Sequence, residues 1–293
     1  MKNNKKKNGK KFLLTLLALL IIIFIVFLYA LFIGSKGLKV KEYKLEITNL
    51  PKEYHGLKIA HISDIHYGET INKNELKNLK DKVNSLKPDI IVFTGDISTD
   101  GLNKKQIEEV SKIMSEMKAS IGKYAINGNH DYKFKKWDIL IDNSGFTNLN
   151  DTFEIIYKNE SQPIMISGIS TNLYGTKNIK DKIEPIMDYL NSFGENSTNE
   201  PVYSILLLHE PDFIEEIDYN KFDLVLSGHS HNGQVRIPFI GALYTPVGAK
   251  KYYDEYYKID NTDLYISSGV GTTLLGVRLF NKPSFNFYRI TTK

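Results

Sequence analysis

The chain has 293 residues, of which 42% are hydrophobic, and a formal net charge of +4. This length and apolar content are typical of a globular protein with one large or two small domains, and they exclude a disordered chain. The modest charge does not indicate nucleic-acid binding by a general basic surface. The absence of cysteine excludes disulfides, thiolate zinc sites, cysteine nucleophiles and a lipidated N-terminal cysteine, and it leaves the redox compartment open.

A basic tail and a long apolar run begin the chain. Residues 1–11 carry six lysines and no acidic residue, and residues 12–33 contain no charged residue. As a helix this run would span about 33 Å, enough to cross the core of a bilayer. A signal peptide has a shorter apolar region, of roughly 7–15 residues, and a cleavage site that we do not find here. We expect an uncleaved, single-pass anchor; a cleaved signal and a buried core helix are the alternatives.

The lysines of the tail predict the orientation of the anchor. Positively charged flanks stay in the cytoplasm, so the rest of the chain would lie on the extracytoplasmic side of the cell membrane. In this interpretation residues 34–38 form a short linker and residues 39–293 form one folded domain.

Apolar runs of strand length alternate with amphipathic helices after the linker. Residues 56–63 and 89–96 are predicted strands, and residues 75–87 between them place their apolar side chains on one helical face. Further helices are expected around residues 107–117 and 179–190. The alternation predicts a single α/β domain, and we find no internal repeat.

Side chains that bind metals follow five of the predicted strands. Loops at the carboxyl ends of strands converge in open α/β sheets, and ligands bind there. In extended backbone, residues two apart point to the same side, so each Asp-x-His or His-x-His pair would address one ion or two neighbouring ions. The residues concerned are Asp64 and His66, Asp96, Asn129 with His130 and Asp131, His209, and His229 with His231.

These side chains combine carboxylates, imidazoles and an amide, without sulfur. The mixture suits divalent first-row metals such as Mn, Fe, Zn or Co. Two ions held about 3.5–4 Å apart by a shared carboxylate would clamp the attacking and leaving oxygens of a phosphoryl displacement. Asp96 stands alone at its strand end and is the natural bridge.

Each motif has a simpler explanation when taken alone. Asp-x-His and Gly-Asp are common by chance, and Asn-His-Asp is also a helix N-cap pattern. A single histidine such as His209 is more often a buried structural residue, and His229 with His231 would also suit a pH-sensitive surface pair. The order of the motifs favours the metal site, because five of the seven histidines fall within them.

The order of the motifs resembles the calcineurin-like metallophosphoesterase superfamily over residues 57–271. The motifs are Asp64-x-His66, Gly95-Asp96, Gly128-Asn129-His130-Asp131, His209 and Gly228-His229-Ser230-His231. The stretches GHSHNGQ and SSGVGT and the N-terminal apolar run are similar to a bacterial membrane-associated branch, some of whose members cleave nucleotide-linked diacylglucosamine pyrophosphates. The resemblance implies a four-layer α-β-β-α fold, with two mixed sheets face to face and helices outside.

The resemblance also implies a role for each motif residue. A water that bridges two metals would attack phosphorus directly, without a covalent intermediate. His130 would act as an acid near the leaving group, with Asp131 orienting it. One metal would be held by Asp64, His66, Asp96 and His231, and the other by Asp96, Asn129, His209 and His229.

Three stretches leave questions open. Asn232 stands where the branch usually has glycine, and its side chain would narrow the loop or touch substrate. The ending VRLFNKPSFNFYRI departs from the usual proline-paired ending, so the place of the terminal strand is uncertain. Lys250–Tyr257 would form either a lip that binds a phosphorylated headgroup or an amphipathic hairpin at the domain edge.

The sequence therefore predicts a membrane-anchored, two-metal hydrolase of a phosphodiester, phosphomonoester or pyrophosphate. The expected substrate is a lipid-linked or cell-envelope phosphate ester, and a soluble nucleotide or phosphoprotein is the alternative. A non-catalytic metal-binding surface protein is a third hypothesis, against which the intact His130-Asp131 pair argues. Metal identity and oligomeric state stay open.

Overall fold

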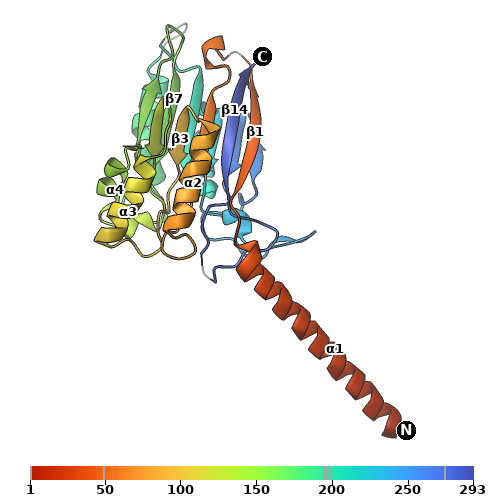
Figure 1. The fold of residues 1–293 in the computed structure, drawn as a ribbon. Coiled ribbons are helices and arrows are strands. Elements are labelled where there is room, and N and C mark those ends of the chain that lie inside the picture. The colour runs from red at the N-terminus through yellow and green to blue at the C-terminus, as the bar shows by residue number, and fades with distance from the viewer. Residues whose placement is uncertain (1, 49, 194–196, 198, 274) are drawn as a thin grey trace.

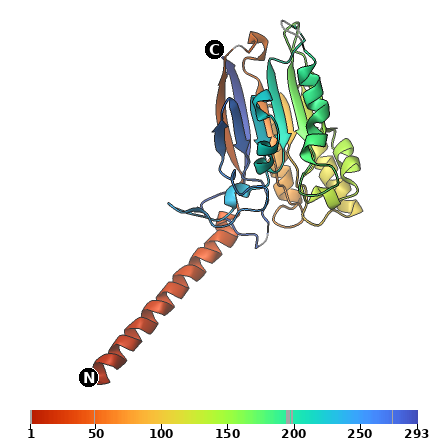
Figure 2. The same cartoon turned by 180° about the vertical axis from the view of Figure 1, so that it is seen from behind.

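Two six-stranded sheets lie face to face in the computed structural model, which describes residues 2–48, 50–193, 197, 199–273 and 275–293. Helices cover the outer face of each sheet (Figures 1 and 2). This is the expected four-layer α-β-β-α arrangement.

The first sheet has the strand order β1-β14-β2-β3-β4-β5. Strands β2 to β5 are parallel, whereas β14 is antiparallel to β2 and parallel to β1. The carboxyl ends of β2, β3 and β4 therefore lie at the same end of the sheet as the starts of β1 and β14; we call this the carboxyl end. The strands are β1 (Lys39–Ile47), β2 (Lys58–Ile62), β3 (Ile90–Phe93), β4 (Gly122–Ala125), β5 (Thr147–Asn148) and β14 (Ser284–Thr292).

The second sheet has the order β12-β13-β9-β8-β7-β6. Its four central strands are parallel and its two edge strands are antiparallel to them. Strands buried on both faces require the continuous apolar runs seen in the sequence. The strands are β6 (Thr152–Ile156), β7 (Ile164–Ile169), β8 (Tyr203–Leu208), β9 (Leu224–Ser227), β12 (Tyr256–Ile259) and β13 (Thr262–Ile266); a separate small hairpin joins β10 (Arg236–Ile237) and β11 (Gly241–Ala242).

Helices α2 (Lys73–Leu86), α3 (Lys104–Ser115) and α4 (Trp137–Asn143) cover the first sheet, and α5 (Ile179–Asn191) covers the second. Capping boxes fix where α2 and α3 begin, because Asn72 pairs reciprocally with Glu75 and Asn103 with Gln106. Short 3-10 turns complete the loops: η2 (Lys52–Tyr54), η3 (Asp131–Lys133), η4 (Pro211–Glu216), η5 (Tyr219–Lys221) and η6 (His231–Gly233).

Three apolar cores separate the four layers. Ile59 of the first sheet and Ile166 of the second pack into the middle core. The outer cores lie under α2, α3 and α4 on one side and under α5 on the other. Alternate residues of β2, such as Ile59 and Ala60, enter different cores because successive side chains of a strand point to opposite faces.

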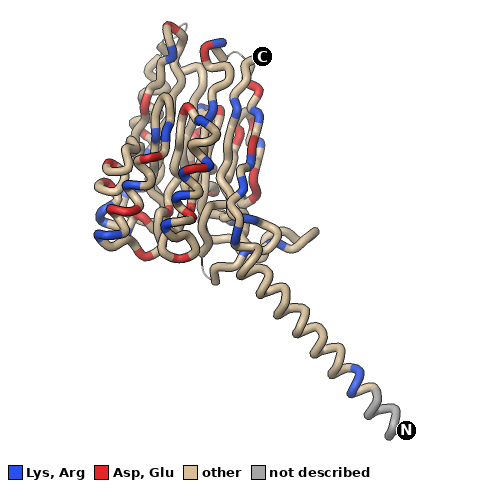
Figure 3. Tube along the Cα trace, viewed as in Figure 1, with Lys and Arg blue, Asp and Glu red and all other residues tan. Residues whose placement is uncertain are grey.

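Helix α1 (Lys2–Tyr29) projects away from the domain and ends in a π-helical turn, η1 (Ala30–Gly34) (Figure 1). Within the described part of the chain, one helical segment, Asn8–Gly34, is long enough and apolar enough to cross a membrane; its mean hydropathy is 3.3. Only 6% of its apolar window is buried, so the segment is not a core helix of this domain. Charge in the described part of the helix is confined to its N-terminal end (Figure 3).

The end of α1 packs directly on the domain at the carboxyl end. The backbone N–H of Arg278 donates to the Ala30 carbonyl at 3.0 Å. A Cβ atom on Gly34 would lie 1.9 Å from the Arg278 carbonyl oxygen, so only glycine permits this approach. Gly34 and Ser35 are buried, so the predicted short linker at residues 34–38 begins with two residues that pack against the domain.

Leu45 tests whether β1 is an integral part of the domain. Its side chain is buried in the middle core, so Leu45→Ala should lower the free energy of unfolding by about 2–5 kcal/mol. Urea unfolding of the full chain in detergent, followed by the fluorescence of the single tryptophan, Trp137, measures this change. Lys44→Ala is the control, because Lys44 is exposed and should change stability by less than about 0.5 kcal/mol. Equal stability of both variants would show that β1 is dispensable.

Candidate dinuclear metal centre

The expected site residues come together at the carboxyl ends of the two sheets. Asp64 and His66 follow β2, Asp96 follows β3, Asn129, His130 and Asp131 follow β4, His209 follows β8, and His229 and His231 follow β9. All are buried except His130, which is half-buried. The convergence of loops from both sheets thus places every one of these side chains in one region.

The backbone at the site is left-handed and not extended, which corrects the expected geometry of the residue pairs. Strand β2 ends at Ile62, before the first pair begins. Backbone hydrogen bonds hold the unusual conformation, including Asp64 N–H to the Gly95 carbonyl at 2.9 Å. Non-glycine residues in this region cost about 1–3 kcal/mol each and cluster at functional sites. Positive φ angles occur at Asp64 (51°), His66 (45°), Asp96 (59°), His229 (63°) and His231 (47°).

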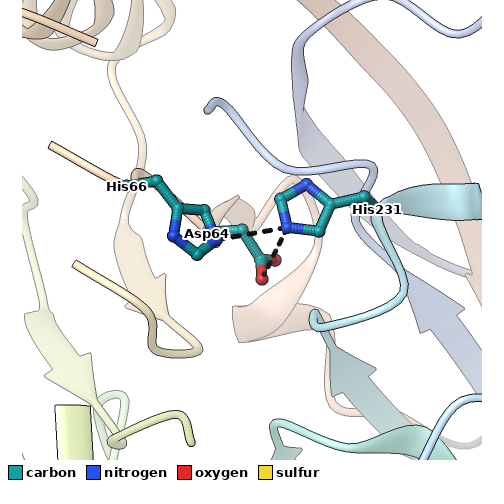
Figure 4. A group of neighbouring side chains, drawn as sticks. All are labelled: Asp64, His66 and His231. Atoms are coloured by element: carbon teal, nitrogen blue, oxygen red, sulfur yellow. Dashed lines mark hydrogen bonds and ion pairs between the residues drawn. The ribbon is translucent and has the colours of Figure 1, made fainter. Parts of the chain in front are cut away.

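Asp64, His66 and His231 form the first cluster, in which their ligand atoms lie within 4.8 Å of one another (Figure 4). The Nε2 atoms of His66 and His231 are 3.2 Å apart, and His231 Nε2 is 3.5 Å from Asp64 Oδ1. The side chains point toward a common centre although they come from different sheets.

Asp96, His209 and His229 form the second cluster. His209 Nε2 lies 3.2 Å from Asp96 Oδ2 and 3.2 Å from Asn129 Oδ1. Asp96 Oδ2 is also 3.9 Å from His66 Nε2, so this carboxylate lies between the clusters. His229 and His231 belong to different clusters, and Ser230 separates them in the chain.

Burial sets the charge of these groups. It lowers the pKa of His66 to about 3 and also lowers the pKa of His229 and His231, so these imidazoles are neutral and keep a free lone pair. Burial, together with the nearby charge of Asp96, raises the pKa of Asp64 to about 6. Neutral imidazoles beside buried carboxylates, with no sulfur, are a donor set that fits two divalent first-row cations.

Backbone carbonyls and one hydroxyl orient the imidazoles through their other ring nitrogens. His209 Nδ1–H donates to the Thr94 carbonyl at 2.5 Å, and His229 Nε2–H donates to the Val247 carbonyl at 2.8 Å. His66 Nδ1 lies 2.9 Å from Thr99 Oγ1. Such partners fix the tautomer and the ring orientation of a ligand.

Two glycines leave room for the carboxylates. A Cβ atom on Gly128 would lie 2.3 Å from Asp96 Oδ1, and one on Gly228 would lie 2.6 Å from Asp64 Oδ2. The glycines of the Gly-Asn-His-Asp and Gly-His-Ser-His motifs are therefore required by close approach to the two acids.

Asp131 has a different role from the expected one. Its carboxylate accepts the backbone N–H groups of Asp96 at 2.6 Å, Ile97 at 2.9 Å and Gly128 at 2.9 Å. Its acceptor sites are thus used to join the loops after β3 and β4. The group that orients His130 is the Thr99 carbonyl, which accepts the Nδ1–H of His130 at 3.0 Å.

Asn232 supports its loop through its side chain. Its φ angle is 47°, a conformation that asparagine tolerates better than most residues. Its Nδ2 donates to the Tyr253 carbonyl at 3.1 Å, and its Oδ1 accepts from Lys41 Nζ at 3.4 Å.

Arg278 is a site neighbour that sequence reasoning missed. It is fully buried, and its Nη2 lies 3.3 Å from His231 Nδ1 and 2.6 Å from the Gly271 carbonyl. The one available signal was an arginine within the apolar stretch GVRLF.

The structure also places the other two stretches that the sequence left open, the chain ending VRLFNKPSFNFYRI and Lys250–Tyr257. The chain ending forms β14, between β1 and β2. The expected hairpin begins only at Tyr256 of β12, while Lys250, Lys251 and Tyr252 form a loop whose backbone N–H groups bind the Asp212 carboxylate.

Two cavities of opposite character open beside the clusters and share Thr99, Asn129 and His130. The basic cavity, of about 710 Å³, is also lined by three lysines, one acid and a tyrosine: Lys133, Lys135, Lys136, Asp100 and Tyr174. The apolar cavity, of about 360 Å³, reaches Asp96, His229 and His231 and is walled by Val235, Tyr244, Pro246, Leu275 and Val277.

Residues 57–233 match the sequence profile of the calcineurin-like phosphoesterase family. The match covers more than half of the chain and includes both clusters. The chain belongs to this family and is a metal-dependent phosphoesterase.

Two relatives match most of this chain. The chain is 29% identical over 266 residues to the uncharacterized metallophosphoesterase YkuE of Bacillus subtilis, covering 89% of this chain and 88% of the relative. It is 26% identical over 266 residues to a Danio rerio protein named transmembrane protein with metallophosphoesterase domain, of which it covers 58%. The crystal structure of TT1561 of Thermus thermophilus has a TM-score of 0.51 at 11% identity, covering 73% of this chain and 90% of that one; it supports the fold alone.

Proposed function

We propose that the chain is a membrane-anchored, two-metal phosphoesterase that cleaves a phosphodiester or pyrophosphate joining a lipid to a polar headgroup. The observation that carries this proposal is the meeting of two unlike cavities at Asn129 and His130. Lys133, Lys135 and Lys136 suit an anionic headgroup, and the apolar wall suits a hydrocarbon chain. A phosphate between these two parts would lie beside both clusters.

The anchor is proposed to be residues 12–33, with a cytoplasmic tail at residues 1–11 and the domain from residue 39 on the extracytoplasmic side. The six lysines of the tail support this orientation, because positive flanks stay in the cytoplasm. The exposed apolar surface of α1 supports insertion, because it would otherwise face water.

We assign the metal ligands from the two clusters. One ion would take Asp64, His66, Asp96 and His231, and the other Asp96, Asn129, His209 and His229. When bound, the two cations would polarise the phosphoryl oxygens and lower the pKa of a bound water.

His130 is proposed to donate a proton to the leaving oxygen. Its Nδ1–H is held by the Thr99 carbonyl, and its backbone N–H donates to Asp96 Oδ1 at 2.9 Å. These two contacts leave Nε2 available toward the cavities that His130 lines. Protonation of a leaving alkoxide by a positioned imidazole is general acid catalysis.

The experiment that tests the substrate class compares two matched esters. Full-length protein in nanodiscs with Mn²⁺ should hydrolyse a lipid-linked pyrophosphate with a kcat/KM about 10²–10³-fold above that of the same headgroup without the lipid, because each buried methylene contributes about 0.8 kcal/mol. The basic cavity alone would serve a soluble nucleotide equally well. Equal kcat/KM for both esters would therefore favour the soluble alternative.

Asp96→Asn should remove more metal than Asp64→Asn. Asp96 lies between the clusters, so its loss affects both ions, whereas Asp64 belongs to the first cluster alone. Metal analysis of the purified variants should show less than one ion per chain for Asp96→Asn, with no measurable hydrolysis. Asp138→Asn on the exposed face of α4 is the control and should retain two ions. Two ions in Asp96→Asn would exclude the bridging role.

His130→Asn should separate proton donation from metal binding. The rate constant should fall by about 10²–10⁴-fold on an alkyl phosphodiester and by less on a nitrophenyl ester, since nitrophenolate leaves without protonation. Metal content should stay at two ions per chain. His55→Asn, at the other end of the domain, should change neither rate. An equal loss on both esters would contradict the acid role.

A further inference from the structure

Two loops near the site expose large apolar side chains. We call them the apolar rim and define it by Phe239, Ile240, Leu243 and Val247 of the loop around β10 and β11, and by Leu275 and Phe280 of the loop before β14. Phe239 is fully exposed, and Leu275 and Phe280 are 72% and 70% exposed. Apolar side chains grouped in this way indicate an interaction surface.

The apolar rim is continuous with the exposed surface of α1. Arg278, between the two exposed residues of the second loop, donates its backbone N–H to Ala30. Lys282 Nζ donates to the carbonyls of Ile33 at 3.5 Å and Lys36 at 3.3 Å. Figures 1 and 2 both show these loops beside the domain end of α1.

Backbone hydrogen bonds also join the two loops of the rim to each other. Arg236 N–H donates to the Leu279 carbonyl at 3.0 Å, and Leu279 N–H donates to the Gln234 carbonyl at 3.2 Å. Backbone hydrogen bonds therefore link the end of α1 to the second loop and the second loop to the start of the first.

We infer that the apolar rim inserts into the outer boundary of the lipid bilayer and forms a second membrane contact around the mouth of the site. The inference rests on the proposed insertion of α1, whose end holds the rim at the level where the chain leaves the membrane. Lys36, Lys250 and Lys282 flank the rim with cations that suit the phosphates of anionic headgroups; Lys250 Nζ lies 5.0 Å from the ring centroid of Tyr244.

The consequence for the site follows from shared residues. Leu275 belongs to the rim and also lines the apolar cavity. Tyr244, which is next to the rim residue Leu243, lines the same cavity. The apolar cavity thus opens at the bilayer surface, and a lipid chain would reach it without crossing water.

Single-cysteine labelling tests the contact directly, because the chain has no cysteine of its own. Phe239→Cys and Phe280→Cys, each carrying an NBD fluorophore on full-length protein in phosphatidylglycerol–phosphatidylethanolamine nanodiscs, should show blue-shifted emission and quenching by lipids with a shallow acyl-chain doxyl group. Tyr157→Cys is the control, because Tyr157 is 59% exposed at the opposite end of the domain. Quenching at 239 and 280 no stronger than at 157 would overturn the inference. The inference would also be overturned if the blue shift of the fluorophore depended on the number of protein copies per nanodisc and not on doxyl lipid. That result would identify a second copy or a protein partner as the group that covers the rim.

An activity measurement separates this inference from the proposed function. Phe239→Ser with Phe280→Ser should lower kcat/KM on a lipid-linked ester in nanodiscs by about tenfold, since interfacial binding scales with buried apolar area, and should leave hydrolysis of a soluble nitrophenyl ester unchanged. Tyr157→Ser should change neither. An unchanged kcat/KM of this double variant on the lipid-linked ester would contradict the insertion of the apolar rim into the bilayer. If the wild type hydrolysed no phosphate ester, the proposed function would fail, while the quenching experiment would still decide the membrane contact.

Discussion

The buried charge of Asp96 is the constraint on which the site depends. A buried carboxylate is costly unless donors or cations surround it. Burial alone would raise the pKa of Asp96, but its interactions with His209 lower it below its usual value. The His130 N–H binds one carboxylate oxygen, Gly128 makes room for it, and Asp131 holds the backbone of Asp96 itself. The loops after β3 and β4 are therefore shaped around one negative charge.

The four-layer fold and the clustering of the motifs could be predicted because both depend on which side chains occur at which positions. Periodic apolar residues mark α2, α3 and α5, and metal binding requires particular side chains at strand ends. The Thr94, Thr99 and Val247 carbonyls that orient imidazoles could not be predicted, because every residue has a carbonyl. The left-handed backbone at Asp64 was missed for a related reason, since non-glycine residues seldom adopt it.

The position of α1 could not be predicted because it depends on pairing between the two ends of the chain. Strands β1 and β14 are parallel in a register that joins Lys39 to Ser284 and Leu45 to Ile290. No local pattern specifies a pair so distant in sequence. This pairing puts the start of β1, and with it the end of α1, at the carboxyl end of the sheet. An antiparallel β1 in the same place would have put α1 at the opposite end from the site.

Arg278 contacts both the end of α1 and the first cluster, and it therefore fixes their positions relative to each other. Its backbone N–H binds Ala30 at the end of α1, and its guanidinium lies 3.3 Å from His231 Nδ1. Burial lowers its pKa to about 9, and buried cations require several hydrogen bonds to be retained. One residue thus connects the domain end of α1 to the first cluster. With α1 inserted as proposed, the cluster would lie at a defined height above the bilayer. A soluble substrate needs no such height, whereas a headgroup phosphate attached to a lipid lies at a fixed depth, so the connection through Arg278 would suit the lipid-linked substrate that we propose.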